Sequence, residues 1–200
     1  MMADSFKVMA DRVEGGETPE AVAQSLLKDN FKAVFNGNGY DPAWPDKAEG
    51  MGIWRIDSGV DAINKLGEEK NLALFESLNV FSRAETIGRK DILLEQYLGT
   101  VDMEVNCMIN MIKTAVIPSC KKAAVDFATA TAGVATLQEA WHKVEALDDL
   151  YEQANAARTL RLETMVTVRA DIDTLEGEVP EEDWKLASYR DLLFLDTHTF

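Results

Sequence analysis

The stretch SRAETIGRKDILLEQYLGTVDMEVNCMINMIKTAV, residues 82–116, decides the fold. It opens with Ser82-Arg83-Ala84-Glu85, the pattern of a capping box, in which a hydroxyl and a carboxylate satisfy the free amides at a helix start. Apolar residues then recur three or four positions apart, which is the spacing of a helix packed lengthwise on another helix. These residues are Leu94, Leu98, Val101, Val105, Met108, Ile112 and Val116. The stretch therefore predicts one long helix, which Pro118 kinks or ends.

A second apolar series downstream predicts the partner of this helix. After a break near Ala132-Gly133 it continues through Leu137, Trp141, Val144, Leu147 and Leu150, and then through Leu162, Met165, Ile172 and Leu175. We expect this series to form the return arm of an antiparallel hairpin, ended by Gly177 and Pro180. A last helix is expected from Pro180 through Leu192 to Leu195.

Residues 1–81 contain shorter helical patterns separated by turn residues. A helix from about Ala3 to Val13 should end at Gly15-Gly16, and Thr18-Pro19 should begin the next. Asp41-Pro42 should cap a third helix, and two more should follow Ser58 and Glu68. Only residues 53–56, IWRI, offer a candidate strand. The sequence predicts an all-α fold, with a short-helix region at 1–81 and a long helical hairpin with a terminal helix at 82–200.

The composition indicates a soluble protein and narrows the possible partners. The 200 residues include 35 acidic and 20 basic side chains, a formal charge of −15, which repels nucleic acids and anionic lipids. No apolar run approaches the ~20 residues that a transmembrane helix needs. Cys107 and Cys120 form no CxxC pair, so we expect two reduced, mostly buried thiols. The first residues lack a signal or transit pattern. We therefore expect a reducing location, either the cytoplasm or an organelle interior.

A search for catalytic motifs yields no candidate catalytic, cofactor-binding or metal-binding residue. The chain contains no GxGxxG, no P-loop and no GxSxG. His142 has no histidine partner at HxxxH spacing, and His198 lies near the C-terminus. The acidic groups at 148–152 and 176–183 match no calcium loop and are interpreted as solvated faces.

One loop is the candidate interaction site. It comprises Asn36, Gly37, Asn38, Gly39 and Tyr40, and Trp44 follows closely. Asn-Gly pairs favour positive φ and tight turns. One interpretation is a turn between helices that is pinned by aromatic residues. The other is a loop whose glycines let the backbone approach a neighbouring surface closely.

Several separate stretches carry a family resemblance. They are FNGNGYDPAW at 35–44, LFE at 74–76 with SRAE at 82–85, LEQY at 94–97, Ile117-Pro118, and VPEEDWKLASYRDLLF at 179–194. In order and rough spacing these stretches resemble the C-terminal region of type III glutamine synthetases. Residues 3–6, ADSF, resemble the start of the same region. The sequence departs from the family pattern at Pro45, at 52–54 and at 99–102.

The resemblance implies a limited role for this chain. The family is an ATP-dependent glutamate–ammonia ligase that uses ATP and Mg, and its catalytic and metal-binding residues lie upstream of the resembled region. We therefore expect no cofactor in this chain and no activity of the chain alone. The expected function is subunit packing or oligomer support, with a catalytic glutamine synthetase subunit as partner. The alternative is a stand-alone structural or linker subunit docked on another large assembly.

Overall fold

The computed structural model describes residues 2–194, all of whose regular structure is helical. This confirms the all-α prediction. Contacts divide the chain into two compact units between Asp57 and Ser58. The predicted domain division at residue 81 stays a prediction.

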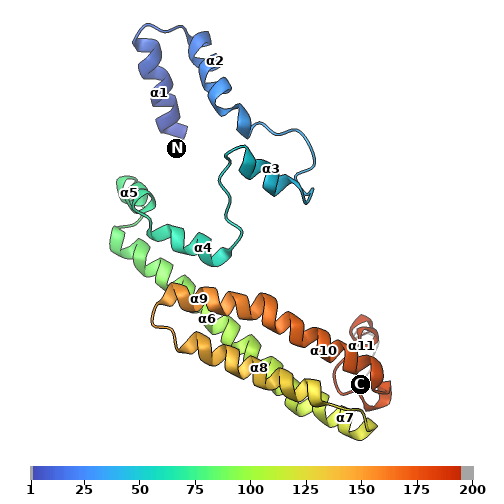
Figure 1. The fold of residues 1–200 in the computed structure, drawn as a ribbon. Helices are drawn as coiled ribbons and strands as arrows, with labels where there is room; N and C mark the ends of the chain where they lie inside the picture. Colours follow the sequence, from blue (N-terminus) through green and yellow to red (C-terminus); the bar gives the residue numbers. More distant parts are fainter. Residues whose placement is uncertain (1, 195–200) are drawn as a thin grey trace. The chain divides into compact units, whose positions relative to one another are not determined.

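The first unit contains three α-helices: α1 (Met2–Glu14), α2 (Pro19–Asn30) and α3 (Trp44–Gly50), with a short 3-10 helix, η1 (Phe31–Ala33), after α2 (Figure 1). Thr18 caps α2 as predicted, because its hydroxyl accepts a hydrogen bond from the Ala21 amide at 3.3 Å. The third helix starts later than expected. Pro45, rather than Pro42, occupies its first turn.

The segment at 53–56 forms no strand, so that candidate was wrong. It has no neighbouring strand to pair with, because all regular structure within residues 2–194 is helical. Arg55 in this segment instead bonds two carboxylates, those of Asp57 and Asp46. Hydrogen bonds of the Arg55 side chain thus fix a segment that has no backbone hydrogen bonds to a neighbouring strand.

The second unit begins with two short helices, α4 (Gly59–Asn64) and α5 (Glu69–Ser77), with the 3-10 helix η2 (Lys65–Gly67) between them. Ser58 caps α4 by accepting from the Asp61 amide at 3.2 Å. Tyr151 donates a hydrogen bond of 2.6 Å to Asp61. This bond fastens α4 to α9, which is described below.

Long helices then pack lengthwise (Figure 1). The first is α6 (Arg83–Met111), continued by the π-helical turn η3 (Ile112–Val116) and α7 (Ile117–Ala123). Next comes α8 (Ala128–Glu145). The last runs through α9 (Leu150–Thr159), the π-helical turn η4 (Leu160–Thr164) and α10 (Met165–Glu178). The predicted return arm is thus two helices, separated at residues 146–149. Of these, α8 runs back along α6, and the helix from α9 to α10 then runs in the same direction as α6 (Figure 1).

Pro118 explains the π-helical turn that precedes it. A proline inside an α-helix lacks an N–H and crowds the carbonyl four residues earlier. Here the Ile117 amide reaches back five residues to the Ile112 carbonyl, which widens the turn just before the proline ring. The helix continues to Ala123 and ends where Ala124 adopts a left-handed conformation, with φ of 56°.

The core lies along the predicted apolar seam. Leu94, Val101, Val105, Ile112 and Val116 are each at most 2 % exposed, and Leu98 and Met108 pack against the core. This confirms the seam. The predicted break at Ala132-Gly133 is wrong, because α8 runs through both residues and Gly133 is buried. The break instead falls at residues 124–127.

After α10 the chain folds back over this bundle. A 3-10 turn, η5 (Glu181–Asp183), leads to α11 (Tyr189–Leu193). The predicted last helix therefore begins at Tyr189 rather than Pro180, because Ser188 and Asp191 form a capping box there. Leu195, its expected end, lies outside the described residues. Trp184 and Leu186 pack on the core between the two elements.

Candidate interaction surfaces

The predicted interaction loop lies in the first unit, between η1 and α3. It brings Asn36 to Tyr40 together, with Trp44 as the first residue of α3. The Asn38 side chain accepts a hydrogen bond of 3.0 Å from the Tyr40 amide, which fixes a local turn. The Tyr40 side chain is 96 % exposed. An aromatic ring in this position is available for contact with another molecule.

Aromatic stacking pins the two ends of this loop. The rings of Phe35 and Trp44 have centroids 3.7 Å apart at an interplanar angle of 30°. A β-carbon on Gly37 would lie 3.0 Å from the Phe35 ring, so a side chain there would displace the ring. Neither Gly37 nor Gly39 has a positive φ, contrary to the expectation for Asn-Gly pairs. Close packing against Phe35 therefore explains why position 37 is a glycine.

The first unit exposes much of its apolar surface. Among its described residues only Val22 and Ala48 are buried hydrophobic side chains. A groove of about 490 Å³ runs between α1 and α2 and is lined by Met9, Val13, Leu26 and Leu27, among others. We call it the α1–α2 groove. Exposed apolar side chains in the same unit are Phe6, Val8, Leu27, Phe31, Val34, Phe35, Tyr40, Met51 and Trp54.

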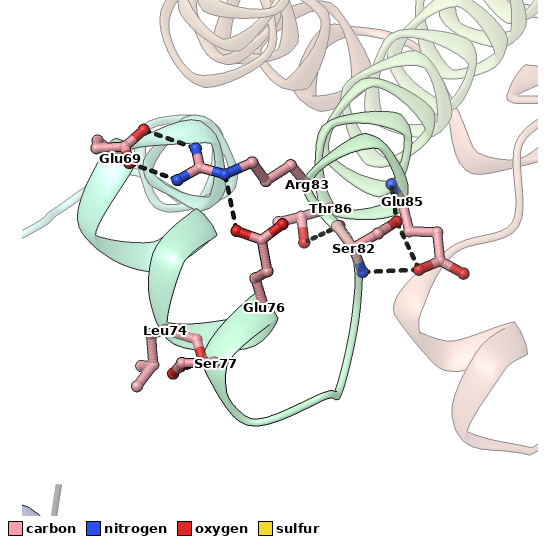
Figure 2. Close-up of polar contacts among 8 residues, drawn as sticks. All are labelled: Glu69, Leu74, Glu76, Ser77, Ser82, Arg83, Glu85 and Thr86. Atoms are coloured by element: carbon pink, nitrogen blue, oxygen red, sulfur yellow. Dashed lines mark hydrogen bonds and ion pairs between the residues drawn. The ribbon is translucent and has the colours of Figure 1, made fainter.

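A charged cluster fixes the junction between α5 and α6 (Figure 2). The Arg83 guanidinium donates two hydrogen bonds to the carboxylate of Glu69, at 2.8 and 2.6 Å, and a third to Glu76 at 2.9 Å. Its planar fork matches a carboxylate in this two-bond geometry. Hydrogen bonding from Arg83 lowers the pKa of Glu69, and the bonds to Glu69 raise the pKa of Arg83.

The capping box at the start of α6 completes this junction (Figure 2). The Ser82 amide and hydroxyl both donate to Glu85, at 2.7 and 2.8 Å, and the Glu85 amide donates to the Ser82 hydroxyl at 3.2 Å. The bond from the Ser82 amide is the main cause of a lowered pKa at Glu85. Thr86 is buried and donates to the Ser82 carbonyl at 3.0 Å. The cluster thus holds the junction between α5 and α6.

Metal-ligand side chains do not converge within residues 2–194. No three His, Cys, Asp or Glu side chains of this range are placed to hold a metal ion. His142 is exposed, with Nδ1 3.2 Å from Glu145. His198 lies outside the described residues. Cys120 is buried and its pKa is raised by desolvation, but Cys107 is exposed, contrary to expectation. No helix in the described range is long and apolar enough to cross a membrane.

A further groove in the second unit escaped the sequence analysis. It has a volume of about 560 Å³ and lies against the π-helical turn η3, α10 and the segment that carries Trp184. Three methionines line it, Met108, Met111 and Met165. Asp173 and Glu176 lie among its polar lining residues. We call it the methionine groove.

The family model of the glutamine synthetase C-terminal domain matches residues 20–135, more than half of the chain. The chain belongs to this family. The match covers the candidate loop, the Arg83 cluster and most of the apolar seam. It confirms the resemblance drawn from the sequence.

Relatives of this glutamine synthetase family extend the match over most of the chain. A type-3 glutamine synthetase of Dictyostelium discoideum is 26 % identical over 87 % of this chain and 28 % of its own length. A glutamine synthetase of Butyrivibrio fibrisolvens is 23 % identical over 90 % of the chain and 30 % of itself. A glutamine synthetase of Bacteroides fragilis is 24 % identical over 96 % of the chain and 32 % of its own length. The chain thus spans less than a third of the length of these relatives.

Proposed function

We propose that this chain is a non-catalytic helical region that packs on a catalytic glutamine synthetase subunit and supports the oligomer. The observation that carries the proposal is the apolar surface of the first unit in a chain of this family. The interaction is assigned to the α1–α2 groove and the loop from Asn36 to Tyr40. No cofactor is proposed for the chain itself.

The energetics of the first unit support docking. Among the described residues of unit 1, only Val22 and Ala48 are buried apolar side chains, which is a very small core for a unit that spans Met1–Asp57. Leu27 is 62 % exposed and Phe31 is 67 % exposed, on successive turns of one helical segment. Burying one such side chain fully stabilises a complex by about 1.5 to 3 kcal/mol. Covering this surface with a partner therefore stabilises the unit.

The family match also supports a role in a glutamine synthetase assembly. The relatives are more than three times as long as the segment they share with this chain. A helical region of this kind contributes surface and rigidity to such an assembly.

Affinity purification from native extract tests the partner. We expect the tagged chain to recover glutamine synthetase subunits, and Leu27→Asp/Phe31→Asp to lose them. Leu162→Asp/Val166→Asp is the matched control, since these residues are also four apart and are 57 % and 59 % exposed. Recovery of unrelated assembly subunits through the same surface would support the linker alternative instead. Undiminished recovery by the Leu27/Phe31 variant would overturn the assigned surface.

A turnover assay tests the non-catalytic part of the proposal. The purified chain is incubated with glutamate, ammonium, ATP and Mg²⁺, and glutamine is measured by chromatography. We expect no glutamine above a heat-denatured control. Turnover by the chain alone would end the proposal.

A further inference from the structure

The methionine groove lies in the second unit and has no role in the proposed docking of the first. Its apolar floor includes Ile112 and Ile172, which are 2 % and 6 % exposed. Leu186 and Leu192 reach it from the segment that follows α10. A volume of about 560 Å³ accommodates two or three large apolar side chains of a partner.

The lining of this groove is adaptable. Methionine has an unbranched, flexible side chain, and methionine-rich surfaces adjust to apolar partners of different shape. Met111 is 42 % exposed at the groove, and its sulfur contacts Cys107 Sγ at 3.8 Å. The π-helical turn η3 supplies Ile112 and Val116, and such turns are frequent at functional sites.

The surroundings of the groove are strongly acidic. Residues 170–183, ADIDTLEGEVPEED, contain seven carboxylates and no lysine or arginine. Asp173 and Glu176 from this segment line the groove. Arg169 also lines it and is ion-paired with Asp173. Lys122 and Arg190 pair with Asp183 and Glu181, so four of the seven carboxylates form no ion pair among the described residues. The groove therefore combines an apolar floor with a negative border.

Trp184 adds an unsatisfied donor at the same place. It lines the groove, and its Nε1 is buried without a hydrogen-bond partner among the residues described. Buried indole N–H groups normally find an acceptor. When a partner displaces the side chains around this ring, a carbonyl oxygen of the partner accepts a hydrogen bond from Trp184 Nε1.

We propose that the methionine groove binds the apolar face of a basic amphipathic helix of another protein. Apolar grooves accept helices through side chains at positions i, i+3, i+4 and i+7. Lysine or arginine on the flanks of such a helix complements the carboxylates of residues 170–183. Charge disfavours a second copy of this chain, which carries −15, and an anionic membrane surface.

Methyl NMR of the full chain identifies the binding face. The probe is a leucine–lysine peptide of about 18 residues, five helical turns, with leucine on one face. The chain has eight methionines. We expect shifts of the methyl signals of Met108, Met111 and Met165, and none at Met9, which lines the α1–α2 groove. Shifts at Met9 alone, or no shift at all, would overturn the proposal.

Two double variants with the same added charge distinguish peptide binding in the groove from nonspecific electrostatic attraction of the peptide to the protein. Met111→Lys/Glu176→Lys places cations in the groove, whereas Met103→Lys/Glu95→Lys places the same added charge on exposed positions of α6 outside it. By fluorescence anisotropy we expect the first to weaken peptide binding about tenfold or more, and the second to change it less than about threefold. Equal weakening by both variants would refute the assigned site.

Two further experiments test which kind of molecule binds the groove. The same peptide with glutamate in place of lysine should bind at least about tenfold more weakly, and higher salt should narrow this gap. Equal affinity for both peptides would contradict the charge argument. Analytical ultracentrifugation of the chain alone tests self-association. A dimer that dissociates only in Met111→Lys/Glu176→Lys would assign the groove to a second copy and overturn the proposal.

Discussion

Replacing Gly133 with alanine should leave the protein less stable than the same replacement at an open helical position, because the new methyl group overpacks the contact with α10. Gly133 lies inside α8, where a glycine costs a helix about 1 kcal/mol relative to alanine. A β-carbon at this position would lie only 2.9 Å from Cγ1 of Val168 on α10. Carbon atoms in contact prefer about 3.5 to 4.0 Å. The two helices would have to move apart or Val168 would have to leave its rotamer.

The free-energy cost of the added methyl group at position 133 follows from a comparison with Gly99→Ala. Gly99 lies inside α6, is exposed, and a β-carbon there meets nothing within 4 Å. Both substitutions gain the same helix propensity, so the difference between them isolates the cost of overpacking. Inserting a methyl group into a packed core costs about 1 to 3 kcal/mol. We expect Gly99→Ala to stabilise by about 1 kcal/mol and Gly133→Ala to be about 1 to 3 kcal/mol less stable than Gly99→Ala.

Urea unfolding followed by far-ultraviolet circular dichroism measures this difference in the full chain. The midpoint should rise for Gly99→Ala, and the midpoint of Gly133→Ala should lie below that of Gly99→Ala at an unchanged slope. If the two variants agree within about 0.5 kcal/mol, α8 does not pack on Val168 as described. The reasoning about the close approach of α8 and α10 would then be refuted.

Four other outcomes follow from single side chains. Ser82→Ala should cost about 1 kcal/mol of unfolding free energy. The wild type should lose stability as the pH falls through the usual glutamate value near 4.5 and below, because the folded-state pKa of Glu85 is lowered, and Glu85→Gln should lose less. In thiol titration with Ellman's reagent, Cys107 should react at once and Cys120 only in denaturant; two fast thiols would contradict the burial of Cys120. Leu137→Ala, at a position that is 0 % exposed, should cost about 2 to 5 kcal/mol in urea unfolding.

Helix starts and the apolar seam could be predicted because their signals are local. The Ser82–Glu85 box, the Thr18 and Ser58 caps and the repeated apolar spacing each need only a few neighbouring residues. Glycine and proline were harder to interpret, because each is compatible with more than one local structure. Gly133 suggested a break, but it permits close packing of two helices. Pro118, which was expected to kink or end the helix, does not end it, because the chain continues through a π-helical turn into α7.

The surfaces depend on contacts that no local pattern contains. The Asn36–Tyr40 loop was found from its composition, and its role as an interaction site stays a prediction. The methionine groove joins Met108 and Met111 to Met165 and Trp184, which are more than 50 residues away along the chain. Sequence spacing placed Met108 and Met165 in two separate helical patterns. Only the fold shows that they line a common groove.

Hydrogen–deuterium exchange tests the central claim, that the first unit docks through its apolar surface. Exchange is compared between the chain alone and the chain in the assembly recovered from native extract. We predict slower exchange in α1, α2 and residues 34–44 of the assembled chain, with the exchange of α8 unchanged. Equal exchange of residues 2–44 in the two states would contradict the account.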